Sequence, residues 1–327
     1  MPDTGRNLEA VANSLPNQSL ASMTQEIDEV VGQVSSIVLG KAHQIRLALA
    51  CLLARGHLLI EDVPGVGKTM LAHALATALG LAFQRIQFTS DLLPADILGV
   101  SIYDREAHGF QFHPGPIFAQ VVLADEVNRA TPKAQSALLE AMEEHQVTIE
   151  GESRRLPQPF FVIATQNPSH QVGTFPLPES QLDRFLMRIE LGYPDAGAER
   201  ELLQGQDRRD LLDTMAPRMN GQALLELQRR ARAVHASEAL LDYVQDIVNH
   251  TRRSSAYLSG LSPRAALALV HAARAWAFMA NRDHIVPEDV QAVLPGVVSH
   301  RLVATAQVSR ANGADVAKGL IDAVPIP

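Results

Sequence analysis

A glycine-rich segment at residues 62–69, Asp-Val-Pro-Gly-Val-Gly-Lys-Thr, has the residue types needed to hold phosphate groups. The phosphate-binding loop pattern G-x-x-x-x-G-K-[ST] begins with glycine, whereas this chain has Asp62, so we expect Gly65 to give the turn its freedom. Lys68 is expected to reach the β- and γ-phosphates and the Thr69 hydroxyl to bind Mg²⁺. The predicted nucleotide-binding residues are Gly40, Val63, Pro64, Gly65, Val66, Gly67, Lys68, Thr69 and Met70. The pattern therefore predicts a site for ATP and Mg²⁺.

Polar residues follow two further apolar segments. Asp125 and Glu126 come directly after the apolar run 121–124, and Asn167 follows the run 160–164. Asp125 fits the Mg²⁺ shell and Glu126 fits the group that polarises an attacking water. Asn167 is a candidate for a hydrogen bond to the γ-phosphate or to that water, although an asparagine after a strand is also a common turn former.

The elements that must position these residues alternate along the chain. Short apolar runs that are typical of buried strands occur at 57–60, 83–88, 121–124, 160–164 and 187–191, with helical or polar stretches between them. This alternation predicts an α/β fold with a parallel sheet covered by helices on both faces. From about residue 198 to residue 311 the pattern is helical, which predicts a second, all-helical domain.

Composition narrows the classes of function. The chain has 327 residues, a formal net charge of −8 and 46% hydrophobic residues, which is typical of a globular protein. Its single cysteine, Cys51, excludes an internal disulfide and is expected to be buried in a helix. No signal peptide or membrane span is evident, so we expect a soluble, cytoplasmic protein. The acidic balance gives no electrostatic support for nucleic-acid binding.

The motifs EDVPGVGKT, ADEVNRA, ATQNP, LPESQLDRF and LSPRA, in this order and spacing, resemble the MoxR family of AAA+ ATPases, in the helix-2-insert branch. The resemblance covers about residues 25–310. It implies a P-loop αβα core, a small helical lid and a ring, often a hexamer. It also implies that Asn167 is sensor 1, that Arg184 is the arginine finger for the neighbouring subunit, and that Arg264 is sensor 2, which links the lid to the nucleotide.

The residues themselves leave the two arginines open. Arg184 could equally be a surface ion-pairing residue. Arg264 follows a Ser-Pro helix start, and an arginine near a positive helix end suggests a partner elsewhere, for which phosphate is a candidate. Arg129 is a further candidate for an intersubunit contact. Lys41 is either an aid in positioning the adenine end or an exposed lysine.

We expect the following organisation along the chain: a flexible leader at 1–23, the ATPase core at 24–195 with inserts near 91–120 and 145–159, a linker at 196–205, the lid at 206–311 and a tail at 312–327.

The predicted function is Mg²⁺-dependent ATP hydrolysis coupled to chaperone-like remodelling or maturation of a protein partner. The resemblance implies a partner with a von Willebrand factor A domain. A competing hypothesis is a DNA-directed motor, for which Arg154 and Arg155 in the second insert are the supporting feature. A nucleotide-gated binding module and a magnesium-chelatase-like ATPase subunit are two further hypotheses.

Overall fold

The computed structural model describes residues 20–106, 108–167, 173–303, 305 and 313–326. Its central element is a five-stranded sheet of β1 (Leu58–Glu61), β2 (Phe83–Gln87), β5 (Val121–Asp125), β8 (Phe161–Gln166) and β9 (Met187–Ile189). The strand order is β2-β5-β8-β1-β9, and all pairings are parallel. The predicted strands and the α/β class are confirmed.

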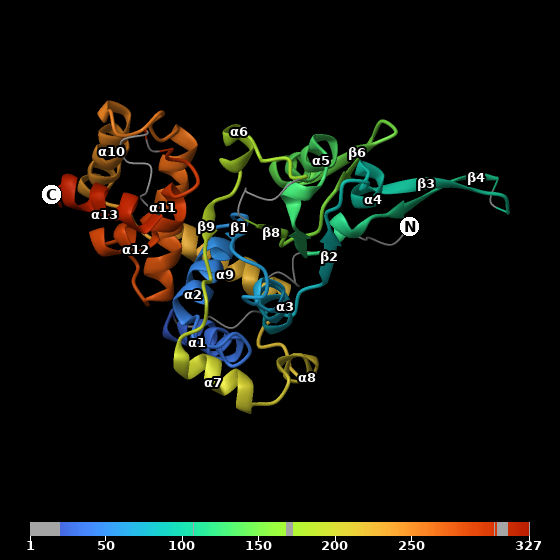
Figure 1. Ribbon diagram of the computed structural model, residues 1–327, viewed down its shortest axis with the longest axis horizontal. Coiled ribbons are helices and arrows are strands. Elements are labelled where there is room, and N and C mark those ends of the chain that lie inside the picture. Colours follow the sequence, from blue (N-terminus) through green and yellow to red (C-terminus); the bar gives the residue numbers. More distant parts are fainter. Residues whose placement is uncertain (1–19, 107, 168–172, 304, 306–312, 327) are drawn as a thin grey trace, which may run out of the picture.

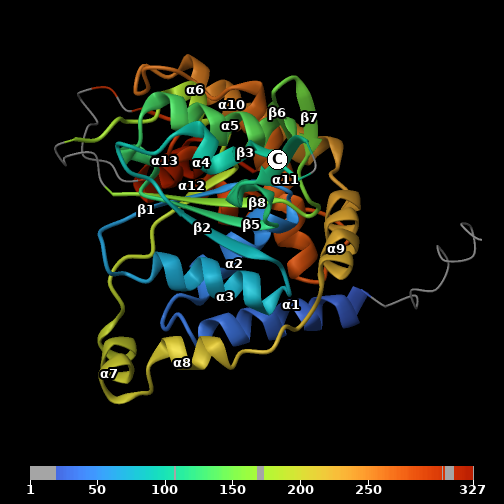
Figure 2. The same cartoon turned by 90° about the vertical axis from the view of Figure 1, so that its right-hand side faces the viewer.

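The apolar core has two layers, one on each face of the sheet, because successive side chains of a strand point to opposite faces. Leu58 and Ile60 pack in one apolar cluster with α1 (Leu20–Ser35), α2 (Ala42–Leu53) and α3 (Lys68–Ala78). Leu59 packs in the other cluster with α4 (Pro94–Leu98) and α5 (Pro132–Glu144). Figure 2 shows these two groups of helices on opposite faces of the sheet.

Each expected insert contains a hairpin. The first consists of β3 (Gly99–Asp104) and β4 (Gly109–Pro114), which Figure 1 shows projecting from the body of the molecule. The second consists of β6 (Gln146–Ile149) and β7 (Glu152–Arg155). The guanidinium of Arg154 lies 4.1 Å from the ring centre of Phe112, so a cation–π contact joins the two hairpins.

The C-terminal third is helical, as expected. It contains α9 (Gly221–Ala233), α10 (Glu238–Arg253), α11 (Pro263–Met279), α12 (Pro287–Val298) and α13 (Gly313–Ala323). α13 lies within the expected tail, but it packs on α12 and buries Ala317 and Leu320, so it is part of the helical unit. No helix among the described residues is long and apolar enough to cross a membrane.

Two other segments differ from the expected organisation. Residues 196–205, expected as a linker, contain α7 (Ala196–Gln204), because the Asp195 side chain accepts a hydrogen bond from the Ala198 amide and so caps a helix. α8 (Arg208–Asp213) follows it. The first 19 residues of the predicted leader lie outside the described part. α1 begins at Leu20, within the predicted leader, and Met23 of this helix is buried in the core.

The lid packs on edge strand β9 and on the chain that leads into it. Gly296 of α12 lies against this strand, since a Cβ atom on it would be 3.5 Å from the carbonyl oxygen of Arg188. Arg301, after α12, donates to the carbonyl oxygen of Phe185 at 2.7 Å and to Asp183 at 2.6 Å. Since these acceptors precede β9, the lid is attached near the amino end of that strand.

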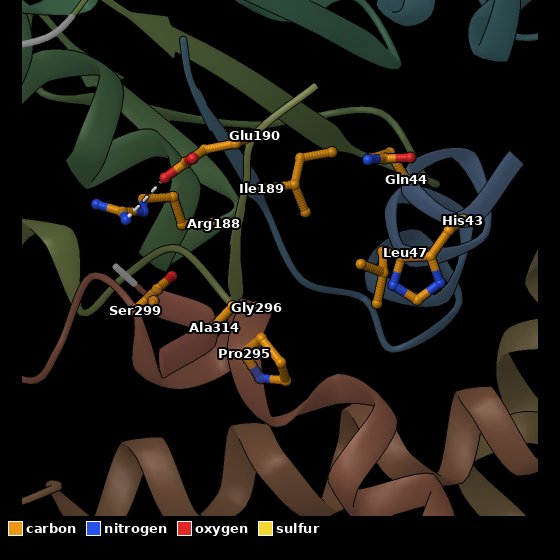
Figure 3. A pocket seen from close by; sticks show the side chains of 11 residues that line it. His43, Gln44, Leu47, Arg188, Ile189, Glu190, Pro295, Gly296, Ser299 and Ala314 are labelled. Carbon is orange, nitrogen blue, oxygen red and sulfur yellow. Dashed lines mark hydrogen bonds and ion pairs between the residues drawn. The ribbon is translucent and has the colours of Figure 1, made fainter. Parts of the chain in front are cut away.

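Figure 3 shows a pocket of about 280 Å³ at this junction of core and lid. Its labelled side chains come from α2, from β9 and the residue after it, and from the end of α12 and the start of α13: His43, Gln44, Leu47, Arg188, Ile189, Glu190, Pro295, Gly296, Ser299 and Ala314. Arg188 and Glu190 form an ion pair along one wall. The helices of the lid therefore meet the edge of the sheet without filling the space between them completely.

Candidate active site

The phosphate loop connects the carboxyl end of β1 to α3. Gly65 and Gly67 have φ angles of 88° and 97°, a backbone conformation that side chains disfavour. A Cβ on Gly65 would meet nothing within 4 Å, and one on Gly67 would meet only Val38, at 4.0 Å. The loop thus leaves open space beside its backbone at the start of a helix, where anions bind favourably.

Asp62 has a role that the loop pattern does not suggest. Its carboxylate accepts three backbone hydrogen bonds: from Val63 at 2.7 Å, Leu191 at 2.7 Å and Gly192 at 2.6 Å. The first stabilises the start of the loop, and the other two tie the loop to the chain after β9. The departure from the glycine of the usual pattern therefore supplies an anchor for the loop.

Lys68, Asn167 and Glu126 form a continuous hydrogen-bonded chain. The Lys68 ammonium donates to Asn167 Oδ1 at 3.0 Å and also to the carbonyl oxygen of Asp62. Asn167 Nδ2 donates to Glu126 Oε1 at 3.2 Å. Burial lowers the pKa of Lys68 from its ordinary value, while the carboxylates of Asp62, Asp125 and Glu126 oppose that shift. The amine thus lies among several carboxylates at the carboxyl edge of the sheet.

Asp125 is almost fully buried, and both of its oxygens have partners. Oδ1 accepts a hydrogen bond from the Thr165 hydroxyl at 2.5 Å, and Oδ2 accepts from Arg85 Nη2 at 2.5 Å and Nε at 3.0 Å. The Thr165 oxygen also accepts from the Glu126 amide at 2.9 Å. Glu126 itself has a left-handed backbone, with φ 58°. Thr165 thereby holds the two acidic residues in a fixed relation.

The donor set fits a hard cation and a nucleotide. Asp125 and Thr69 offer a carboxylate and a hydroxyl, the oxygen ligands that Mg²⁺ prefers, and Lys68 and the loop amides are suited to phosphate. Among the described residues, no group of three or more His, Cys, Asp or Glu side chains is placed to hold a metal on its own. In nucleotide sites Mg²⁺ is usually bound by one or two protein oxygens together with water and phosphate oxygens.

Other residues near the loop have structural partners. Gly40 lies against α7, since a Cβ there would be 3.1 Å from Ala198 Cβ. Lys41 is buried and donates to the carbonyl oxygen of Tyr193 at 2.8 Å, so it is not an exposed lysine and its amine is committed to the fold. Arg129 pairs with Glu126 within the same chain at 2.7 Å.

Arg184 and Arg264 lie together, at the edge of the sheet opposite to the phosphate loop. Both pair with Glu143 at the end of α5, Arg184 at 2.9 Å and Arg264 at 2.6 Å. The Leu186 amide donates to the carbonyl oxygen of His57, the residue before β1. The segment that contains Arg184 therefore lies where the parallel strands begin, which we call the amino edge of the sheet. The phosphate loop follows the carboxyl end of β1, and four strand residues span about 13 Å.

The structure therefore brings Lys68, Asp125, Glu126 and Asn167 together and keeps the two arginines away from them. Arg264 lies away from the phosphate loop of its own chain, because the lid is attached near the amino end of β9, and its expected role as the link between lid and nucleotide stays a prediction. In this chain the guanidinium of Arg264 pairs with the carboxylate of Glu143.

Sequence reasoning missed Arg85, Thr165 and Glu143. Thr165 is a polar residue in the buried strand β8, which is a signal that was available, whereas Arg85 lies in β2, a strand of mixed polar and apolar residues in which it does not stand out. Glu143 carries no such signal, since it is one of several acids on α5 and its two arginine partners come from distant segments.

Known proteins resemble this chain over most of its length. Residues 57–187 match the model of the ATPase family associated with various cellular activities (AAA), and residues 249–318 match the AAA lid domain. The chain is 43% identical over 303 residues to the uncharacterized protein YeaC of Bacillus subtilis, covering 92% of this chain and 95% of that protein.

It is 41% identical over 298 residues to the chaperone MoxR1 of Mycobacterium tuberculosis, covering 88% of this chain and 78% of that protein. A solved structure from Cytophaga hutchinsonii, described as that of a candidate ATPase, superposes with a TM-score of 0.86 at 37% identity, covering 94% of this chain and 97% of that one. Two of these three relatives are matched over nearly their whole length. Lys68, Asp125, Glu126, Asn167 and Arg184 lie within the matched AAA region and Arg264 lies within the matched lid, whereas Gly40 precedes both. The chain belongs to the MoxR family of AAA+ ATPases.

Proposed function

We propose that this chain hydrolyses Mg²⁺-bound ATP in a ring whose neighbouring subunits complete each other's active sites. The observation that carries the proposal is the division of the machinery between two edges of one sheet. Lys68, Asp125, Glu126 and Asn167 lie at the carboxyl edge, and Arg184 and Arg264 lie at the amino edge on a shared carboxylate.

Each residue at the carboxyl edge has a role that its contacts support. Lys68 and the loop amides hold the phosphates, and Asp125 with Thr69 would hold Mg²⁺, which would neutralise phosphate charge when bound. Glu126 is the base that orients the attacking water. Asn167, bonded to both Lys68 and Glu126, keeps the ammonium and the carboxylate in register.

The arginines act on the neighbouring subunit. A guanidinium can stabilise charge on a phosphate only by contact, and neither arginine can reach the loop of its own chain past the sheet. Glu143 holds both in the isolated chain, and a phosphate of the next subunit would compete with it for them. Activity should therefore require assembly.

Mixing of variants tests this division. Steady-state ATPase activity is measured against protein concentration for three proteins alone: the wild type, Arg184→Ala and Glu126→Gln. It is then measured for an equimolar mixture of the two variants. We expect turnover of the wild type to rise with concentration and the mixture to exceed the sum of its components, because Glu126→Gln subunits supply the arginine that the others lack.

The Arg264→Ala protein is mixed in the same way. Arg229→Ala is the matched control, since Arg229 is an exposed arginine paired with Glu226 on α9. Full activity of wild-type monomers, or a mixture no more active than its parts, would show that the sites are not shared.

We further propose that hydrolysis remodels or matures a protein partner, with a von Willebrand factor A domain as the class that family resemblance suggests. The name of the relative MoxR1 supports a chaperone role. The projecting β3–β4 hairpin exposes Ile102, Tyr103 and Phe110, the last by 75%, and exposed apolar surface of this kind is typical of partner contacts. Loss of partner binding in Phe110→Ser with unchanged basal ATPase activity would support this contact.

The structure gives little support to a DNA-directed motor. Arg154, one of the two arginines that favoured it, stacks on Phe112 and pairs with Glu152 at 2.5 Å.

A further inference from the structure

A pocket of about 210 Å³ lies between the end of α2, α9 and α11. Three arginines line it, Arg55, Arg232 and Arg274, together with His271, Gln228 and the apolar groups of Leu53, Ala54 and Ala231. No acidic residue is among these lining residues. We call it the α9–α11 pocket.

The arginines of the α9–α11 pocket lack the partners that nearby arginines have. Within the part of the chain that the structure describes, Arg232 and Arg274 form no ion pair, and the buried Nε of Arg274 has no hydrogen-bond partner. The Arg55 side chain donates to the neutral amide of Gln228, at 3.2 Å, and forms no ion pair within the described part of the chain. By contrast, Arg229 and Arg230, three and two residues before Arg232 on α9, both pair with Glu226.

Three positive charges therefore gather at one opening, with Arg55 and Arg232 exposed to solvent and Arg274 half-buried. Burial lowers the pKa of His271, and the neighbouring charges of Arg274 and Arg232 lower it further. The histidine can relieve the repulsion by staying neutral, but guanidinium groups remain charged at any ordinary pH. The crowding occurs in a chain with a net charge of −8, so it is not a consequence of a generally basic surface.

We propose that the α9–α11 pocket binds a small anion of the phosphate class that carries two or more negative charges. Guanidinium forks match the oxygens of such an anion in bidentate geometry. A single carboxylate would leave most of the three positive charges uncompensated. The volume is below the roughly 300–1,000 Å³ of sites for drug-sized ligands, which favours a small anion over a whole nucleotide.

The location distinguishes this site from the phosphate loop. The α9–α11 pocket shares Ala54, Arg55 and His271 with the neighbouring pocket that contains Arg184 and Arg264, so both lie toward the amino edge of the sheet. The proposal nevertheless depends only on the residues of the α9–α11 pocket and not on the assembly of subunits.

Pyrophosphate is the probe, and calorimetric titration at constant ionic strength in the presence of a chelator is the measurement. The protein is the full chain carrying Lys68→Ala, which removes the lysine contact at the phosphate loop. Arg232→Gln and Arg274→Gln are then introduced singly. The matched control is Arg229→Gln, which removes an exposed charge from the same helix without touching the pocket.

We expect pyrophosphate to bind the Lys68→Ala chain and each pocket variant to weaken binding by about tenfold or more, the effect of losing one good charge-assisted contact. Arg229→Gln should change the affinity by less than about twofold. Because Arg232 is exposed, its variant should fold normally, and equal circular dichroism spectra would show this. The proposal would be overturned if the Lys68→Ala chain did not bind pyrophosphate at millimolar concentration, or if the pocket variants bound it as tightly as that chain does. A loss of affinity in the Arg229→Gln control as large as that in the pocket variants would overturn it as well.

Discussion

The ion pair between Arg85 and Asp125 leads to a prediction about metal affinity. Arg85 binds the same carboxylate that is proposed to face Mg²⁺, with its side chain 49% exposed and that of Asp125 9% exposed. If the cation takes the place of the guanidinium, the ion pair stabilises only the metal-free state. Replacing Arg85 by the uncharged, unbranched methionine should then strengthen the binding of Mg²⁺.

The size of the effect follows from the environment of the pair. A hydrogen bond to a charged group contributes about 1.5–3 kcal/mol, whereas an exposed ion pair contributes about 0–1 kcal/mol. Since one partner is half in solvent, about 1.5 kcal/mol is a reasonable value for Arg85 and Asp125. That free energy corresponds to about a tenfold change in an equilibrium constant.

The assay is thermal unfolding at a saturating non-hydrolysable ATP analogue, titrated with Mg²⁺. In Arg85→Met the metal-free protein should unfold at a lower temperature than wild type, and the Mg²⁺ concentration that gives half of the stabilisation should fall about tenfold. Arg230→Met, which breaks a remote helical ion pair, is the control and should leave that concentration unchanged. An unchanged or higher Mg²⁺ requirement in Arg85→Met would show that Arg85 and the cation do not compete.

Three further changes probe the same architecture. Asp62→Gly restores the usual first residue of the loop pattern. It should nevertheless lower the free energy of unfolding by about 2–4 kcal/mol and weaken nucleotide binding, because three backbone amides lose their acceptor. Equal denaturant midpoints for the variant and the wild type would refute this. Thr165→Val keeps the shape of the side chain but leaves Asp125 and the Glu126 amide without their shared hydroxyl. Turnover, measured by single-turnover kinetics, should therefore fall at least about tenfold. Nucleotide affinity, measured by equilibrium titration, should change little. Burial lowers the pKa of His57 to about 4. As the pH falls from about 6.5 to about 4, this histidine is protonated in the unfolded state but still neutral in the folded state. The free energy of unfolding should therefore decline over this range, by about 3 kcal/mol from this group. Denaturant unfolding across this pH range should show a shallower decline in His57→Gln, and an equally steep one would exclude His57 as a main cause.

The buried histidine illustrates why that pH dependence is a property of the fold. His57 Nδ1 accepts from the Val162 amide at 3.0 Å, and its Nε2 contacts the carbonyl oxygen of Met142 at 3.2 Å. A neutral ring satisfies both contacts. A protonated ring would turn its acceptor into a donor and place a charge in the interior.

The sequence by itself determined the α/β class, the strands and the residues of the phosphate loop. These features follow from local rules: apolar runs form buried strands, glycine permits the turn of the loop, and carboxyl ends of parallel strands meet at one edge. For this reason Lys68, Asp125, Glu126 and Asn167 could be placed together in advance, and the structure does place them together.

Only the tertiary structure decided the partners of the remaining charged residues. Glu143 meets Arg184 and Arg264 because α5 ends at the amino edge, where the lid is attached, and nothing in the local sequence of any of the three indicates this. Asp62 holds residues 191 and 192 for the same kind of reason, since β9 runs parallel to β1 and both strands end at the same side of the sheet. Pairings between segments far apart in the chain depend on how layers pack and not on local pattern, so the distribution of the arginines between edges could be learned only from the fold.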